Sequence, residues 1–165
     1  MTTQIKGNDT STFGGNIDVP QIVTDAPAFK AVLSADQTGN TAAFTKVQIN
    51  TVDFDLTSDF DTSNYRWIPS VAGYYHIMGQ VYINTLADGK LGISVIYKNG
   101  TEFARGSQHS NGSTVACLSI ASTLVYMNGT TDYVELYGYH NNASSLDFKS
   151  SIKWTNFSGH LVRAV

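Results

Sequence analysis

Residues 91–105 read Leu91-Gly-Ile-Ser-Val-Ile-Tyr-Lys-Asn-Gly-Thr-Glu-Phe-Ala-Arg105, and this stretch decides the fold. Apolar residues recur at every second position from Leu91 to Tyr97, which is the period of a β-strand with two different faces. The pair Asn99-Gly100 then tolerates the positive φ that a tight hairpin turn requires at both positions. A second strand-like run, Glu102–Arg105, follows at once. The stretch therefore predicts a β-hairpin that turns at Asn99-Gly100.

The same signals recur along the rest of the chain. Tyr75, Ile77 and Val81 share one parity, and the pairs Asp88-Gly89 and Asn128-Gly129 also separate strand-like runs, where they predict tight turns. No window of a dozen residues carries the apolar spacing of an amphipathic helix. Short strands separated by turn signals, without crossover helices, predict an all-β antiparallel sandwich, barrel or jelly roll.

Composition excludes several classes of protein. The chain has 165 residues and a net charge of −3, which fits one domain and offers no basic footprint for nucleic acid. No apolar run is long enough to insert into a membrane, and the N-terminus lacks the pattern of a secretory signal. The single cysteine, Cys117, lies in an apolar run, so a buried inert thiol is favoured over a reactive nucleophile. We expect synthesis in a cytoplasm.

The first 26 residues differ from the remainder. Met1–Ala26 is rich in Thr, Asn, Asp and Gly and cannot enclose a core, so we divide the chain into residues 1–26 and a domain at 27–165. Such a segment is either a flexible leader or an arm that becomes ordered on a neighbouring protein. As an arm, it would anchor the protein through Ile5, Phe13, Ile17, Val19 and Ile22.

Apolar and aromatic residues in the domain fall at a recognisable spacing. This spacing resembles the signature of the globular head domain of complement C1q. That signature has an aromatic residue, an Asn or Asp, two aromatic residues and then Gly-x-Tyr-x-Phe-x-aromatic. The matching positions in this chain are Ile49, Asp55, Phe60, Trp67, Gly73, Tyr75 and Ile77. Phe157-Ser-Gly-His-Leu161 is similar to that family's closing strand, Pro27-Ala-Phe29 to its opening strand and Tyr97–Gly100 to its central hairpin. Ile49 and Ile77 stand where the family usually has Phe, and Gly79 replaces the last aromatic.

This resemblance, which covers Pro27 to Val165, has consequences for fold and role. It implies a ten-stranded antiparallel jelly roll, like that of tumour necrosis factor, which associates as a homotrimer. It also implies a binding or structural role rather than catalysis. Some members bind calcium, but no calcium site can be carried over to positions in this chain. We expect the core to contain Ile49, Phe60, Trp67, Tyr75, Ile77, Phe157 and Leu161.

The strands expected around residues 74–82 and 133–139 carry aromatic residues on both faces, although the outer face of a sandwich should be polar. Tyrosine and methionine are enriched at protein interfaces because they combine apolar area with a polar or adaptable group. These side chains either decorate a solvated sheet or form the contact between copies. We favour a trimer interface formed by Tyr74, His76, Met78, Tyr82, Tyr133, Tyr137 and Tyr139.

No pattern in the sequence supports catalysis or a cofactor. His76, His109, His140 and His160 are scattered singly, and His76 and His160 are interpreted as strand residues with local hydrogen bonds. A hard cation could be bound by the carboxylates of Asp53, Asp55, Asp59 and Asp61. The Gly and Glu of an EF-hand loop are missing, so we favour a solvated loop. Gly14-Gly15 lacks the Lys-Ser/Thr of a phosphate-binding loop, and a Gly-x-Ser-x-Gly elbow is absent. We expect no metal, no cofactor and no enzymatic activity.

A jelly-roll trimer with a short Thr/Asn/Gly-rich arm resembles parts of bacteriophage particles. We expect a structural protein on the outer surface of a virion that decorates or cements the capsid, with residues 1–26 bound to the major capsid protein or another virion protein. The arm spans at most roughly 90 Å when fully extended, which suits a shell surface better than a long fibre. One alternative is a fibre tip that binds a host receptor, such as a surface glycan, through the loops at 107–113 and 140–145. A soluble carbohydrate-binding module is the other.

Overall fold

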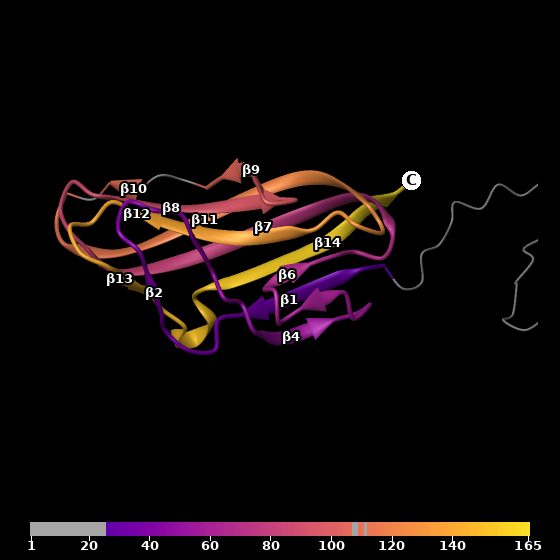
Figure 1. Ribbon diagram of the computed structural model, residues 1–165, viewed down its shortest axis with the longest axis horizontal. Helices are drawn as coiled ribbons and strands as arrows, with labels where there is room; N and C mark the ends of the chain where they lie inside the picture. Colours follow the sequence, from indigo (N-terminus) through magenta and orange to yellow (C-terminus); the bar gives the residue numbers. More distant parts are fainter. Residues whose placement is uncertain (1–25, 107–108, 111) are drawn as a thin grey trace, which may run out of the picture.

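The structure, a computed structural model, describes residues 26–106, 109, 110 and 112–165. These residues form two β-sheets that pack face to face, with the long strands running along the length of the molecule (Figure 1). The described residues contain one short 3-10 turn, η1 (Ser151–Lys153), and no helix that is long and apolar enough to span a membrane. The all-β antiparallel sandwich expected from the sequence is confirmed.

The first sheet, called here the β7 sheet, has the order β2-β13-β7-β14-β1-β4, and β11 pairs with the other edge of β7. All of its named strand pairs are antiparallel. Its strands are β1 (Ala28–Val32), β2 (Gln37–Gly39), β4 (Thr51–Asp55), β7 (Ala72–Leu86), β11 (Val115–Asn128), β13 (Leu146–Phe148) and β14 (Asn156–Ala164).

The second sheet, called here the β8 sheet, has the order β10-β8-β12-β6-β5, with β3 paired to β12 and β9 paired to β8. Its strands are β3 (Thr45–Lys46), β5 (Phe60–Asp61), β6 (Arg66–Trp67), β8 (Leu91–Lys98), β9 (Thr101–Arg105), β10 (His109–Ser110) and β12 (Val134–His140). The two sheets together divide into fourteen strands over the described residues, against the ten expected. Six of these pieces are only two or three residues long.

The core lies between the sheets and is rich in aromatic rings. Trp67 stacks on Phe29 with ring centroids 4.6 Å apart and meets the edge of Tyr75 at 5.1 Å. Of the seven residues expected in the core, five are fully buried: Ile49, Trp67, Tyr75, Ile77 and Phe157. Phe60 and Leu161 are partly buried and pack against this core. Burial of each such large side chain stabilises the fold by about 1.5–3 kcal/mol, so these rings hold the sheets together.

Only one of the three expected tight turns is a two-residue hairpin. Asn99 and Gly100 have φ values of 51° and 76° and join β8 to β9 within one sheet. Asp88-Gly89 also lies in a tight turn, because the Lys90 N–H donates to the Ala87 carbonyl oxygen at 3.1 Å, but this turn joins strands of different sheets and makes no hairpin. Asn128-Gly129 likewise lies in a connection that crosses from the β7 sheet to the β8 sheet. Packed sheets are separated by about 10 Å, so a crossing needs a longer connection than a two-residue turn.

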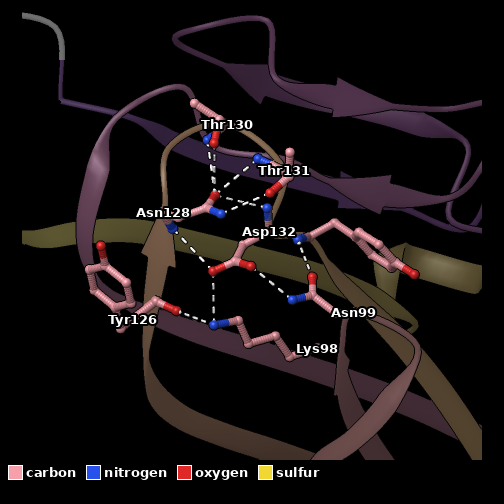
Figure 2. A network of polar contacts seen from close by, with 8 residues as sticks. Lys98, Asn99, Tyr126, Asn128, Thr130, Thr131 and Asp132 are labelled. Carbon is pink, nitrogen blue, oxygen red and sulfur yellow. Dashed lines mark hydrogen bonds and ion pairs between the residues drawn. The ribbon is translucent and has the colours of Figure 1, made fainter.

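The connection from β11 to β12 is held by a network of polar contacts (Figure 2). Asn128 Oδ1 accepts hydrogen bonds from the backbone N–H groups of Thr130, Thr131 and Asp132, at 2.9–3.0 Å. The Asp132 carboxylate in turn binds Lys98 Nζ at 2.9 Å and Asn99 Nδ2 at 2.8 Å. This network joins the crossing connection to the β8–β9 hairpin.

Candidate assembly surface

The outer side of the β7 sheet is a candidate site formed by described residues. Along β7, residues with odd numbers from 73 to 83 are buried, and those with even numbers point outward. Tyr74, His76, Met78 and Tyr82, four of the expected interface residues, therefore share this outer side. Tyr74 is 49% exposed, and the other three are half-buried.

The neighbouring strand β11 doubles this surface. Its outward side chains include Leu118, Ile120, Leu124 and Tyr126, which are between 41% and 62% exposed. The register places Leu118 opposite Tyr82, Leu124 opposite His76 and Tyr126 opposite Tyr74. We call eight of the outward residues of β7 and β11 the apolar face: Tyr74, His76, Met78, Tyr82, Leu118, Ile120, Leu124 and Tyr126.

The interpretation of the sequence missed the contribution of β11, although a signal is present. Leu118, Ile120, Leu124 and Tyr126 share one parity, while Cys117 and Val125, on the other, are buried. Apolar residues at both the odd and the even positions of one strand also distinguish residues 74–82. The signal in β11 is weaker because Ser and Thr interrupt its apolar positions.

The two strands that form the apolar face contain no acidic or basic residue other than His76. Neither Ala72–Leu86 nor Val115–Asn128 contains Asp, Glu, Lys or Arg. An exposed surface rich in apolar side chains and without Asp, Glu, Lys or Arg is typical of a protein–protein contact rather than of a solvated sheet. The arrangement can therefore support association by burial of apolar area.

The structure separates the other three expected interface residues from this face. Tyr137 and Tyr139 lie on β12, and Tyr133 directly precedes it, so all three belong to the β8 sheet on the opposite layer of the sandwich. The prediction of one surface containing all seven residues is wrong. Alternation along a strand indicates which residues point away from the core, but it does not indicate which of the two sheets the strand joins.

Tyr137 and Tyr139 instead belong to an aromatic cluster, formed by Phe44, Tyr97, Tyr137 and Tyr139. The Tyr133 ring lies under the Arg66 guanidinium, with the ring centroid 4.7 Å from the guanidinium carbon. The rings of Tyr97 and Tyr137 stack at 4.0 Å, and those of Phe44 and Tyr139 lie 4.9 Å apart. Burial raises the pKa values of the Tyr97 and Tyr137 hydroxyls above their ordinary range. The cluster covers Val95, which is fully buried on the outer side of its strand. Its rings are thus partly used in packing.

The acidic residues singled out in the sequence each have separate local partners. Asp53 Oδ1 pairs with Lys153 Nζ at 2.6 Å, and Asp55 Oδ2 accepts the Phe60 N–H at 2.7 Å. Asp59 accepts hydrogen bonds from Ser70, while bonds from Asn64 hold the pKa of Asp61 below its ordinary value. The described part of the chain contains no group of three or more His, Cys, Asp or Glu residues that could hold a metal ion. The four carboxylates therefore have separate partners and do not converge on one site.

The histidines and the cysteine occupy different environments. His140 is fully buried, with Nε2 3.0 Å from the Gly39 carbonyl oxygen. His76 and His160 lie beside each other on the outer side of the β7 sheet. Cys117 is buried, and burial raises the pKa of its thiol to about 11, which leaves the thiolate scarce at neutral pH. The arm residues Ile5, Phe13, Ile17, Val19 and Ile22 lie outside the described residues.

Comparisons with known proteins bear on the fold. No protein-family model and no curated protein sequence matches the chain. Among solved structures, murine APRIL is similar at a TM-score of 0.64 and 12% identity, covering 83% of this chain and 99% of that one. The globular domain of zebrafish complement 1qA has a TM-score of 0.60 and 14% identity, with 85% and 99% covered.

A third similar structure is Eiger TNF from S. frugiperda, with a TM-score of 0.59, 9% identity, and 85% of this chain and 93% of that chain covered. The three likenesses extend over nearly the whole of each neighbour. At such low identity they establish architecture and not activity. The chain therefore has the jelly-roll fold of the C1q and TNF globular domains.

Proposed function

We propose that the protein is a non-enzymatic structural protein of a bacteriophage particle. In this proposal three copies associate through the apolar face into a knob that decorates or cements the outer surface of the capsid. Residues 1–26 of each copy anchor the knob to the major capsid protein or another virion protein. The observation that carries the proposal is the uncharged apolar face on β7 and β11.

Self-association is supported by the energetics of this face. Burial of apolar surface contributes roughly 25 cal/mol per Å², and a stable interface covers about 800 Å² on each partner. Exposed side chains as large as Leu124 and Tyr126 supply apolar area at no cost in buried charge. The C1q/TNF-like fold is also consistent with homotrimers, as the resemblance in sequence implies.

The particle context is supported by the arm. Residues 1–26 are rich in Thr, Asn and Gly and carry apolar residues singly, a composition that suits a segment which orders on a partner. Three weak arms on one trimer bind with high avidity when their sites on the partner are spaced to match. Decoration of a shell with repeated subunits satisfies that condition.

A matched pair of substitutions tests the assembly surface. Leu124 on β11 and Phe103 on β9 are both exposed apolar residues, at 62% and 47%, but they belong to opposite sheets. Leu124→Asp places a carboxylate in the proposed contact, where its desolvation opposes association. Sedimentation velocity should give the wild type and Phe103→Asp about three times the 17.9 kDa mass of one chain, and Leu124→Asp a smaller species. A folded wild-type monomer would refute the proposal.

A second candidate function is favoured by the aromatic cluster on the β8 sheet. Arg105 lies over the Phe44 ring at 5.1 Å and pairs with Glu102, so aromatic and charged groups lie close together on this layer. Such a surface can contact sugars, which supports a fibre tip that binds a host glycan or a soluble carbohydrate-binding module. Electron microscopy of labelled particles distinguishes the candidates, because decoration predicts label over the whole capsid and a tip predicts label at the fibre ends.

A further inference from the structure

His76 and His160 face each other directly across two neighbouring strands. The antiparallel register of β7 and β14 pairs these two residues, and their ring centroids are 5.4 Å apart with an interplanar angle of 55°. The residues next to them in the chain, Tyr75, Ile77 and Gly159, are buried. Because side chains alternate along a strand, both imidazoles lie on the outer side of the sheet. The ladder of backbone hydrogen bonds fixes the spacing of the two side chains.

This spacing leaves room for one ion between the rings. Because zinc–nitrogen bonds measure about 2.0–2.1 Å, an ion held by one nitrogen of each ring lies about 3.2 Å from each ring centroid. Because the two ring centroids are 5.4 Å apart, the lines from the ion to the two centroids form an angle of roughly 115°. This angle is close to the tetrahedral angle that zinc prefers. Two further positions remain for water or for a side chain of another copy.

Ser122 on β11 provides a second element of a built site. Its Oγ lies 2.8 Å from Nε2 of His76. When Nε2 carries the ring proton it donates to this hydroxyl oxygen, and Nδ1 keeps the lone pair that a metal requires. Metal-binding histidines commonly donate their other ring N–H to such a partner, which fixes the tautomer and the orientation of the ring.

The pair lies in a hollow that is open to solution. His76 and His160 line this hollow of about 350 Å³ together with Met78, Phe54 and Ser158. Lys30 lines it as well, and its Nζ lies 4.0 Å from Asp53 Oδ2, a carboxylate that also pairs with Lys153 at 2.6 Å. His160 is exposed, which leaves the pair open to an ion from solution.

From these observations we propose that His76 and His160 bind one divalent transition-metal ion of the class that prefers imidazole, such as Zn²⁺ or Ni²⁺. The site needs only one protomer, so it goes beyond the proposed assembly and does not depend on it. If the apolar face, which includes His76, is also the contact between copies, the ion lies at the edge of that contact, where a second copy can supply its remaining ligands.

Calorimetric titration of the full chain with zinc chloride, after removal of metals by a chelator, tests the proposal. The expected stoichiometry is one zinc per chain. His76→Gln and His160→Gln should each weaken binding by more than the roughly 10- to 100-fold that loss of even an outer hydrogen-bond partner costs. Ser122→Ala should weaken it by an amount within that range, because the ring loses its orienting contact while both ligands remain.

His109→Gln is the matched control, since His109 lies on β10 in the other sheet and should leave zinc affinity unchanged. The proposal is overturned if the wild type binds no zinc at millimolar concentration, or if binding survives loss of both His76 and His160. Loss of binding in His109→Gln also overturns it. Circular dichroism and sedimentation of each variant show whether fold and oligomeric state are retained, so a failure of the metal site is distinguishable from a failure of the trimer.

Discussion

At the scale of single residues, close contacts between glycine and an aromatic ring position one end of the sandwich. Phe148 on β13 is fully buried between Gly39 on β2 and Gly138 on β12. A Cβ atom added at either glycine would lie 2.6 Å from a carbon of the Phe148 ring. The ring is therefore blocked on both sides, and neither glycine can gain a methyl group without displacing it.

Gly138→Ala should accordingly destabilise the protein. Overpacking of a tight core costs about 1–3 kcal/mol, and Phe148 cannot move away because Gly39 confines its other side. Urea unfolding followed by fluorescence measures the change in the free energy of unfolding. The control is Gly112→Ala, where an added Cβ meets open space and stability should not change. Addition of Phe148→Leu to Gly138→Ala should recover part of the loss; an unchanged midpoint in Gly138→Ala alone would contradict this packing.

At the scale of elements, the sequence predicts where strands form, but it does not predict which of the two sheets each strand joins. The strand over Leu91–Tyr97 and the Asn99-Gly100 turn depend on neighbouring residues, and both appear in the structure. The burial of β8 does not alternate, because Gly92–Ile96 are all buried and Ile96 is the residue of this run in the main core cluster. Tyr137 was assigned to the wrong surface because pairing of β12 with β8 depends on contacts between residues about 40 positions apart. The sequence therefore predicts where strands form, while the candidate site needs the order of strands in the sheets.

The crossing from β11 to β12 gives an element-scale prediction about pH. Partial burial opposes ionisation of Asp132, but hydrogen bonds from Asn99 and Lys98 outweigh it and hold the pKa of this carboxyl below its ordinary 3.8. The folded state therefore prefers the charged form. The resulting stability is fully present above about pH 4 and is lost as the pH falls through the lower folded-state value.

Asp132→Asn should thus cost about 1.5–3 kcal/mol at pH 7, the usual range for hydrogen bonds to a charged group. The difference from the wild type should shrink as the pH falls toward 3, because the wild-type carboxyl then becomes neutral. Thermal unfolding at a series of pH values measures both effects. Asp88→Asn alters an exposed aspartate in the other crossing connection and should leave stability unchanged at every pH. A pH-independent difference for Asp132→Asn would contradict the role of its charge.

At the scale of the whole molecule, the two layers of the sandwich present different surfaces. Strands β7 and β11 offer apolar side chains without charge, and the β8 sheet offers packed aromatic rings beside ion pairs such as Lys46–Glu135 at 2.6 Å. Burial of such ion pairs against another copy would remove water from their charges, which opposes close association. In the proposed trimer the β7 layer faces the other copies and the β8 layer faces outward.

This division leads to a prediction about the arm, residues 1–26. Among the described residues, the Leu161 N–H donates to the Pro27 carbonyl oxygen, and β1 begins at Ala28. In the proposed role, removal of residues 1–26 should leave the melting temperature and the sedimentation coefficient of the trimer close to those expected for the shorter chain. In the proposed role it should abolish co-sedimentation with the phage particle, because attachment passes through the arm alone. Retained attachment would instead assign the contact with the particle to the jelly roll, and a truncated chain that sediments as a monomer would move the trimer contact from the apolar face to the arm.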